Sequence, residues 1–348
     1  MRIWLPIILA LAWLYTVLRC VYFLPLHLPL RALVALVLFV IAEHYLLIRR
    51  WFGSLASPEL PRAVLFTLTW LFGTFVLIFV LLVLRDLAGP LVLAVVPHVG
   101  LIVLRDPRIS WAIAVLAACL AFVGVWQAVK VPNVKTVGVD LAGWPRAFEG
   151  YRIVQLSDLH LSRLLPARWA RAVVDGANAL GANLIVITGD LADGSVAARA
   201  ADVAPLADLR APDGVLVIAG NHEYYSGYRA WLQAYRGLGL RMLENEHVVI
   251  QRGGGALVVV GVTDRQAVTF GEPRPDLAAA LAGVTRAGAI VLLDHRPGRA
   301  RANARAGATL QLSGHTHGGQ ILGLSLFARR ERWLCVGALP RRRPAALR

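Results

Sequence analysis

Two histidines separated by one residue, His315 and His317, lie between Gly314 and Gly318. They follow an apolar run at 308–312 that predicts a strand. In a loop after a strand, both imidazoles can face one small region, and neutral imidazole is the commonest metal ligand in proteins. The flanking glycines allow the backbone to pass close to a bound ion. A His-x-His pair also occurs in ordinary turns, so its meaning depends on the residues that accompany it.

Other residues of metal-ligating types follow further predicted strands. The carboxyl ends of strands in an α/β sheet share one edge, where ligands collect. Any one of these groups could be an ordinary cap or turn, but five strand ends that deliver such side chains to one edge favour a metal site. The residues are Asp158 and His160 after the strand at 152–156, Asp190 and Asp193 after 184–188, Asn221, His222 and Glu223 after 215–219, and Asp294 and His295 after 290–293.

These candidates are too many for a single ion. A catalytic metal ion usually takes three or four protein ligands and keeps an open position. Seven candidate ligands suit two ions that share a carboxylate. Two divalent ions about 3.5–4 Å apart can hold the oxygens of a phosphoryl group and lower the pKa of a water molecule. Such chemistry requires no serine or cysteine nucleophile, and the motifs indicate none.

The chain beyond residue 150 alternates short apolar runs with helical stretches rich in Ala, Leu and Arg. This alternation predicts a layered α/β domain. We expect strands at 152–156, 184–188, 215–219, 257–262, 290–293 and 309–312, with further strand pairing over 242–251. We expect helices at 167–180, 196–209, 228–238 and 276–282. The segment 131–150 is predicted to be a linker with an opening strand at its valines.

The first 130 residues account for an apolar composition of 57% and a mean hydropathy of +0.61, which is too apolar for an ordinary soluble enzyme. Four stretches approach the roughly 20 residues that span a bilayer, at 3–24, 28–48, 63–84 and 111–129. Buried core helices are the alternative, but four helices that are apolar on every face do not suit a core in water. We therefore expect a multi-pass transmembrane bundle over 1–130, in contact with the lipid bilayer.

The number of spans and their orientation stay open. The run at 91–104 is short and interrupted by Pro97, so it could be re-entrant, interfacial or a fifth span. With four spans, the N-terminus and the C-terminal domain share a side of the membrane. That side then carries six Lys or Arg residues near the spans against five on the other, and the positive-inside rule does not choose between them.

Charge and cysteine content limit the classes of partner. The formal charge of +15 lies mostly at the two ends, because residues between 131 and 328 include nineteen basic and sixteen acidic side chains. A nucleic-acid-binding surface is therefore not indicated, whereas basic ends suit anionic lipid headgroups. Three cysteines, Cys20, Cys119 and Cys335, provide no disulfide framework.

The five blocks together resemble the calcineurin-like metallophosphoesterases. In order they are Asp-x-His, Gly-Asp-x-x-Asp-Gly, Gly-Asn-His-Glu, a lone His, and Gly-His-Thr-His-Gly-Gly-Gln, over about 150–320. The extended form Gly-Asn-His-Glu-Tyr-Tyr-Ser-Gly is similar to a bacterial membrane-anchored subgroup that includes relatives of UDP-diacylglucosamine hydrolase. The resemblance implies a four-layer α/β domain, a two-sheet sandwich, at 151–328. The expected fold is thus an all-α transmembrane bundle followed by this domain.

The resemblance also implies a role for each residue. One metal ion would be held by Asp158, His160 and His317, and the second by Asn221, His295 and His315. Asp190 would bridge the two ions. His222 would not bind metal but would hydrogen-bond the phosphate or protonate the leaving oxygen. The ions would be Mn, Fe or Zn. Asp193 and Glu223 are expected to support the site, and Asp294 is a rival ligand to His295.

The family continues with further strands after the His-x-His block, whereas this chain has 28 residues after Gln320. We expect 329–348 to be a basic, atypical tail. The predicted function is membrane-anchored, two-metal hydrolysis of a phosphomonoester, phosphodiester or diphosphate, with lipid-linked substrates as one expected class. A non-catalytic metal-binding scaffold or sensor is the alternative, although it would not need His222. A transporter would be expected to carry buried ionisable groups inside its spans, and we expect only Glu43 and His44, close to the end of a span, to be such groups.

Overall fold

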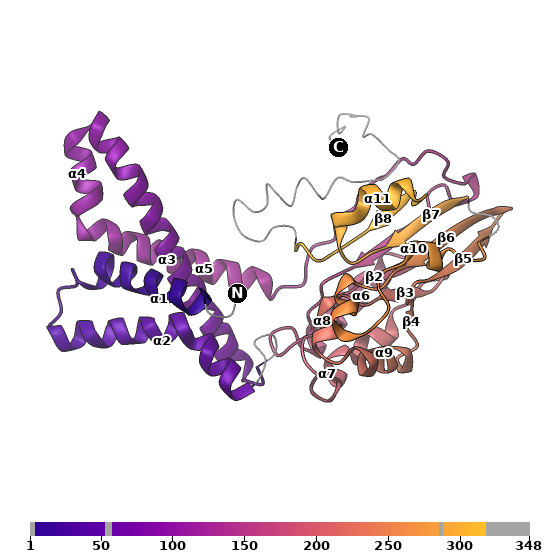
Figure 1. The fold of residues 1–348 in the computed structure, drawn as a ribbon, viewed down its shortest axis with the longest axis horizontal. Helices are drawn as coiled ribbons and strands as arrows, with labels where there is room; N and C mark the ends of the chain where they lie inside the picture. Colours follow the sequence, from indigo (N-terminus) through magenta and orange to yellow (C-terminus); the bar gives the residue numbers. More distant parts are fainter. Residues whose placement is uncertain (1–3, 53–57, 285–287, 318–348) are drawn as a thin grey trace. The chain divides into compact units, whose positions relative to one another are not determined.

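The structure, a computed structural model, describes residues 4–52, 58–284 and 288–317. The chain divides into two compact units, Met1–Lys130 and Val131–Arg348. The first unit is helical and the second is built on two β-sheets (Figure 1). The predicted tail at 329–348 lies outside the described residues. The predicted domain limits of 151–328 also extend past them and stay a prediction.

The first unit contains four helices that are long and apolar enough to cross a bilayer. Their mean hydropathies are 1.8, 2.0, 2.5 and 2.2. Many of their leucine, valine and isoleucine side chains are exposed on the outside of the bundle, as lipid-facing helices require. The prediction of a transmembrane bundle is confirmed. The helices are α1 with its continuation η1 (Trp4–Val21), α2 (Leu28–Phe52), α3 (Arg62–Val95) and α5 (Pro107–Ala128).

The run at 91–104 does not form a fifth span. Its first part continues α3 to Val95, and the rest forms α4 (Pro97–Arg105). Proline disfavours a helical conformation in the residue before it, and Val96 accordingly has φ −134° and ψ 83°. With nine residues, α4 is about 14 Å long, which is less than half of the hydrocarbon thickness of about 30 Å. It packs back on α3, where a Cβ on Gly100 would lie 2.3 Å from Leu93 Cα.

One cluster of charged side chains inside this unit is held together by hydrogen bonds and ion pairs. The Asp86 carboxylate accepts hydrogen bonds from Arg19 Nε at 2.6 Å, from Arg85 Nε at 2.8 Å and from Tyr15 at 2.5 Å. Arg85 also donates to Ser110 Oγ at 2.6 Å. Because a charged group in a membrane protein is costly unless it is paired, this cluster explains how α3 carries two adjacent charges. It also ties α3 to both α1 and α5.

The described residues of the second unit form two four-stranded sheets in which the strand order follows the sequence. The first sheet is parallel and comprises β1 (Ile153–Leu156), β2 (Leu184–Thr188), β3 (Val215–Ile218) and β4 (Arg241–Met242). The second comprises β5 (Glu246–Arg252), β6 (Gly255–Gly261), β7 (Ala289–Leu293) and β8 (Leu310–Leu312). Within it, β5 is antiparallel to β6, while β6, β7 and β8 are parallel. Gly253 and Gly254, both with positive φ, make the tight β5–β6 turn.

Side chains of alternate residues along each strand pack into two different cores. In β2, Leu184 and Val186 face the second sheet, whereas Ile185 and Ile187 face helices. The outer face of the first sheet is covered by α6 (Ala167–Ala179), α7 (Val196–Val203) and α9 (Tyr228–Gly237), and that of the second by α10 (Leu277–Ala280) (Figure 1). In addition, α11 (Ala300–Arg305) packs against β8. The predicted two-sheet α/β sandwich is confirmed, with helices outside both sheets.

The helices of this unit are amphipathic and are capped where they begin. In α6, the buried residues Ala170, Val173, Val174 and Ala177 recur every three or four positions, which is the spacing of one helix face. Ser195 caps α7 by accepting a hydrogen bond from Ala198 N. These helices fix the loops that follow β1 and β2.

The opening strand predicted within 131–150 is wrong. The segment 131–141 pairs with no strand in the described part of the chain, and its valines are exposed. Instead, apolar side chains anchor this segment to the sandwich. Leu141 and Trp144 contact the core between the sheets, and Phe148, in η2 (Arg146–Phe148), is buried there. Strand propensity alone does not form a strand without a neighbour to pair with.

Candidate metal centre

The carboxyl ends of β1, β2, β3, β7 and β8 meet at one edge of the sandwich, and all eight predicted site residues lie there. Two sets of three carry donor atoms that lie within 4.8 Å of one another. The first set is Asp158, His160 and His317, and the second is Asp190, His295 and His315. These sets combine residues more than a hundred positions apart in the sequence.

In the first set, ring nitrogens converge on a common point. His160 Nε2 and His317 Nε2 lie 3.1 Å apart, and His317 Nε2 is 3.5 Å from Asp158 Oδ1. Asp158 is held in place because its carboxylate accepts hydrogen bonds from Ser157 Oγ at 2.5 Å and from His315 N at 2.9 Å. Two imidazole nitrogens and a carboxylate that face one another form a donor set suited to a divalent transition-metal ion or zinc.

In the second set, His295 occupies the central position. Its Nε2 lies 3.3 Å from Asp190 Oδ2 and 3.2 Å from Asn221 Oδ1. Its Nδ1 lies 2.7 Å from the Thr188 carbonyl oxygen. Since a carbonyl only accepts, Nδ1 carries the proton and Nε2 is the nitrogen that faces the site. Metal-ligating histidines are commonly fixed in this way by a carbonyl on their other nitrogen.

Asp190 lies between the two sets. Its Oδ2 is 3.8 Å from His160 Nε2 and 3.3 Å from His295 Nε2, one nitrogen from each set. Its Oδ1 accepts a hydrogen bond from His222 N at 2.9 Å. Although burial favours the neutral acid, the hydrogen bond and charge of His295 hold the pKa of Asp190 well below its usual range. An ionised carboxylate is therefore placed where a bridging ligand would be needed.

The backbone is strained at these residues. Among the described residues, six that are not glycine have positive φ, and five of them belong to the site. Asp and His enter this region more readily than most residues, but each instance still costs of the order of 1–3 kcal/mol and is typical of functional sites. The five are Asp158 (53°), His160 (44°), Asp190 (55°), His315 (69°) and His317 (46°).

Glu223 joins two of the loops that carry the site. It is 1% exposed, and its Oε1 accepts a hydrogen bond from Leu191 N at 2.8 Å. Its Oε2 accepts from Gly220 N at 2.8 Å and from Asp190 N at 3.1 Å. One buried carboxylate therefore fixes the loop after β2 against the loop after β3. This geometry suits the loop-orienting role predicted for Glu223.

Asp193 lies between His222 and His160. Its Oδ1 is 2.6 Å from His222 Nδ1 and 3.0 Å from His160 Nδ1. The donor atoms of these three residues lie close enough together to hold a metal ion, but the separations from Asp193 Oδ1 to the two histidines are those of hydrogen bonds. Although burial favours the neutral imidazole, the hydrogen bond to Asp193 raises the pKa of His222. His222 is thus held by Nδ1 as a proton donor beside the two sets.

A sequence profile described as "Calcineurin-like phosphoesterase" matches residues 151–319, which include all of these strand ends. This is a calcineurin-like phosphoesterase domain. The chain is similar to the "Transmembrane protein with metallophosphoesterase domain" of Danio rerio, with 31% identity over 222 residues, and of Bos taurus, with 34% identity over 229 residues. Each match covers 62% of this chain, and the chain spans about half the length of these relatives (51% and 52%).

An uncharacterized metallophosphoesterase of Campylobacter jejuni is 29% identical over 294 residues, which is 82% of this chain and 74% of that protein. That alignment is longer than the second unit, so it extends into the helical unit. The present chain has four apolar helices of spanning length and is therefore a multi-pass membrane protein. The finer resemblance to relatives of UDP-diacylglucosamine hydrolase is not tested by these matches and stays a prediction.

One residue of the phosphoesterase site, Arg296, has no signal in the sequence. Its Nη1 lies 2.8 Å from His315 Nε2, its Nη2 donates to Asn221 Oδ1 at 3.0 Å, and its Nε donates to Asp264 Oδ2 at 2.7 Å. Burial and this guanidinium lower the pKa of His315 to about 4, so the imidazole is neutral. Asp294, the rival to His295, turns away and accepts from Asn303 Nδ2 at 3.1 Å.

The donor sets fit two divalent cations, with one condition. The neutral imidazole of His315, the imidazole of His317, whose pKa is lowered by burial, and the ionised carboxylate of Asp190 have the chemistry that Mn, Fe or Zn requires. Arg296, however, contacts His315 Nε2 and Asn221 Oδ1, which belong to two of the three residues predicted to hold the second cation. A cation can bind there only when the guanidinium gives up those contacts.

Replacing Arg296 with Met should strengthen binding of the second cation by about thirtyfold. The guanidinium makes two hydrogen bonds that a cation must displace, each with a net value of about 1 kcal/mol, and its positive charge opposes a second one. Calorimetric titration of the chelated protein with Mn²⁺ measures the change. Arg299→Met, at an exposed arginine nearby, is the matched control. Thermal unfolding is measured alongside, because Asp264 loses its partner. Unchanged or weaker affinity in a folded variant would contradict the prediction.

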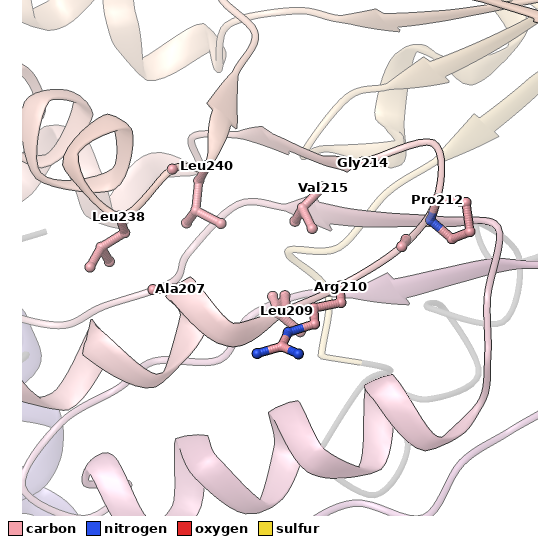
Figure 2. A pocket seen from close by; sticks show the side chains of 10 residues that line it. Ala207, Leu209, Arg210, Pro212, Gly214, Val215, Leu238 and Leu240 are labelled. Atoms are coloured by element: carbon pink, nitrogen blue, oxygen red, sulfur yellow. The ribbon is translucent and has the colours of Figure 1, made fainter.

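A surface depression of about 460 Å³ lies elsewhere in the domain (Figure 2). It is lined by residues such as Leu209, Arg210, Val215 and Leu240. Val215 begins β3, whereas Asn221 follows the end of that strand, so the depression lies at the opposite end of the sheet from the metal centre. Arg210 is its only ionisable lining residue, and the depression takes no part in the site.

Proposed function

We propose that this domain hydrolyses a phosphomonoester, phosphodiester or diphosphate with two divalent cations. The observation that carries the proposal is the position of Asp190, whose Oδ2 faces one imidazole nitrogen of each set at 3.3 and 3.8 Å. When bound, the cations supply Lewis acidity to the phosphoryl oxygens and lower the pKa of a water molecule. Mn, Fe and Zn are the candidate ions.

In this proposal, each side chain has the role that the family resemblance implies. Asp158, His160 and His317 would hold one cation, Asn221, His295 and His315 would hold the other, and Asp190 would be shared. The remaining histidine, His222, has its Nδ1 engaged by Asp193, so its Nε2 is the nitrogen that can reach the substrate. Although burial favours the neutral ring, the hydrogen bond to Asp193 raises the pKa of His222 and so favours the protonated form, which a general acid for the leaving oxygen requires. A non-catalytic scaffold or sensor would not require the hydrogen-bonded pair of His222 and Asp193.

Removing the metal should abolish hydrolysis. The full-length protein in detergent, after chelation, should lose at least about 99% of its activity on bis(p-nitrophenyl) phosphate, because the chain offers no other electrophile of comparable strength. Adding back Mn²⁺, Fe²⁺ or Zn²⁺ should restore the activity, with two ions bound per chain by elemental analysis.

Two variants make this test specific. His317→Ala should not be reactivated by added metal, because it lacks a ligand of the first set. His247→Ala should be reactivated like the wild type, since His247 lies on β5 with its Nδ1 against the Ala280 carbonyl oxygen. Full activity in a protein shown to be free of metal would disprove the proposed function.

A further inference from the structure

Exposed apolar side chains of the domain gather beside His222. Among the described residues from 150 onward, four large apolar side chains are exposed, and three of them lie on α8 (Asn221–Tyr225) and η4 (Arg265–Phe270). These are Tyr225 (54% exposed), Val268 (62%) and Phe270 (48%), which we call the apolar ledge. The fourth, Val249, lies on strand β5. Single exposed apolar residues are ordinary, but a cluster of them marks a binding surface.

The ledge is continuous with the catalytic centre. Tyr225 ends α8 (Asn221–Tyr225) three residues after His222, so both lie on one helix face. Their ring centroids are 5.6 Å apart. On its other side, Tyr225 lies 6.1 Å from the ring of Phe270, and its hydroxyl donates to Gln266 Oε1 at 3.3 Å. A substrate whose phosphate is bound beside His222 therefore meets the ledge directly.

Packing against the site holds the ledge in its exposed position. The helix η4 (Arg265–Phe270) begins after the buried Asp264, which accepts a hydrogen bond from Arg296 at 2.7 Å. Ala267, a residue of η4, is fully buried. With Asp264 and Ala267 fixed, Val268 and Phe270 are turned outward by the local backbone. The exposure of these two side chains is thus a consequence of the fold.

We propose that the apolar ledge binds an alkyl chain of the substrate, so that the substrate class is a phosphate ester of a lipid. This inference rests on the proposed function. The chain itself limits the alternatives: α5 ends at Ala128 and the packed part of the domain begins at Leu141, so the segment 129–140 joins the domain to a helix that is apolar enough to cross a bilayer. Lipid phosphates are concentrated at the surface of a bilayer. The exposed Arg265 at the start of η4 adds positive charge beside the ledge, which suits an anionic lipid.

The test uses p-nitrophenyl alkyl phosphates, from methyl to octyl, with the full-length protein in detergent. An alkyl chain lying on the ledge should raise kcat/KM about twofold per methylene. This factor corresponds to half of the free energy gained when a methylene is buried completely. The octyl-to-methyl ratio of kcat/KM is the readout. In Val268→Ser and Phe270→Ser this ratio should fall at least fivefold. In Val249→Ser, the matched exposed control, it should stay at the wild-type value. Partitioning of the esters into detergent is the same for every variant and cancels.

Other results would overturn the inference. An octyl-to-methyl ratio that is equal in the wild type and in both ledge variants would show that the ledge does not contact the chain. If thymidine 5′-(p-nitrophenyl phosphate) lost activity in Tyr225→Ser while the alkyl series was unaffected, the ledge would bind a nucleobase instead. If the wild type with added Mn²⁺ cleaved none of the esters, including the methyl ester, the proposed function would fail, and this inference with it.

Discussion

Replacing Asp190 with Asn should lower kcat/KM for an aryl phosphodiester at least about a thousandfold, equivalent to roughly 4 kcal/mol of transition-state stabilisation, and should reduce bound metal from two ions per chain to one or none. Among the residues that the structure describes, Asp190 is the only carboxylate that faces both donor sets. In the variant, the amide oxygen would keep the hydrogen bond from His222 N, now made to Oδ1. The amide NH₂ would then face His160 and His295, and it repels cations.

The matched control for this prediction is Asp175→Asn, which makes the same chemical change at an exposed position of α6. Metal content by elemental analysis, steady-state kinetics and thermal unfolding are measured on both variants. The control should keep two ions and wild-type kcat/KM. If Asp190→Asn also kept two ions and full activity, Asp190 would not be a bridging ligand.

The strands that carry the site could be predicted because the chemistry of their residues is unambiguous. The run 184–188 is buried on both faces in the structure, and strands of this kind appear in a sequence as uninterrupted apolar residues that end at a glycine. The shared edge then follows from the parallel order of the strands, which places Asp190 beside the residues that follow β1 and β3. Proximity within the site was therefore accessible from sequence, and the assignment of each ligand depended on the family resemblance.

Other features depend on contacts that leave no local pattern. Arg296 reaches His315 and Asp264 only through the relative placement of β6, β7 and β8. The third span was predicted to end at 84, yet α3 continues past two charged residues to Val95. It can do so because Asp86 is paired with Arg19, a residue of another helix. In both cases a side chain from a distant segment satisfies a charge, and the local sequence does not record which one.

Removing the imidazole of His222 should lower kcat about a hundredfold or more, the usual effect of losing a general acid, and should remove the alkaline limb of the pH–rate profile. Asp193→Asn should have a smaller effect on rate but should move that limb to lower pH. The acid acts only when protonated, so activity falls as pH rises through the pKa of His222. Asp193 raises this pKa. Without its negative charge, the pKa falls towards or below the ordinary value of about 6.5, since burial opposes the charged ring.

The two variants also separate the proton donor from the metal centre. Asp193 contacts His160 Nδ1 at 3.0 Å as well, so a loss of activity in Asp193→Asn could reflect poorer metal binding. Metal content is therefore measured for each variant across the pH range. If the alkaline limb moves while two ions stay bound, the shift belongs to His222. A limb that stays in place in Asp193→Asn and persists in His222→Ala would assign it to another group, and the proton for the leaving oxygen would then have to come from solvent.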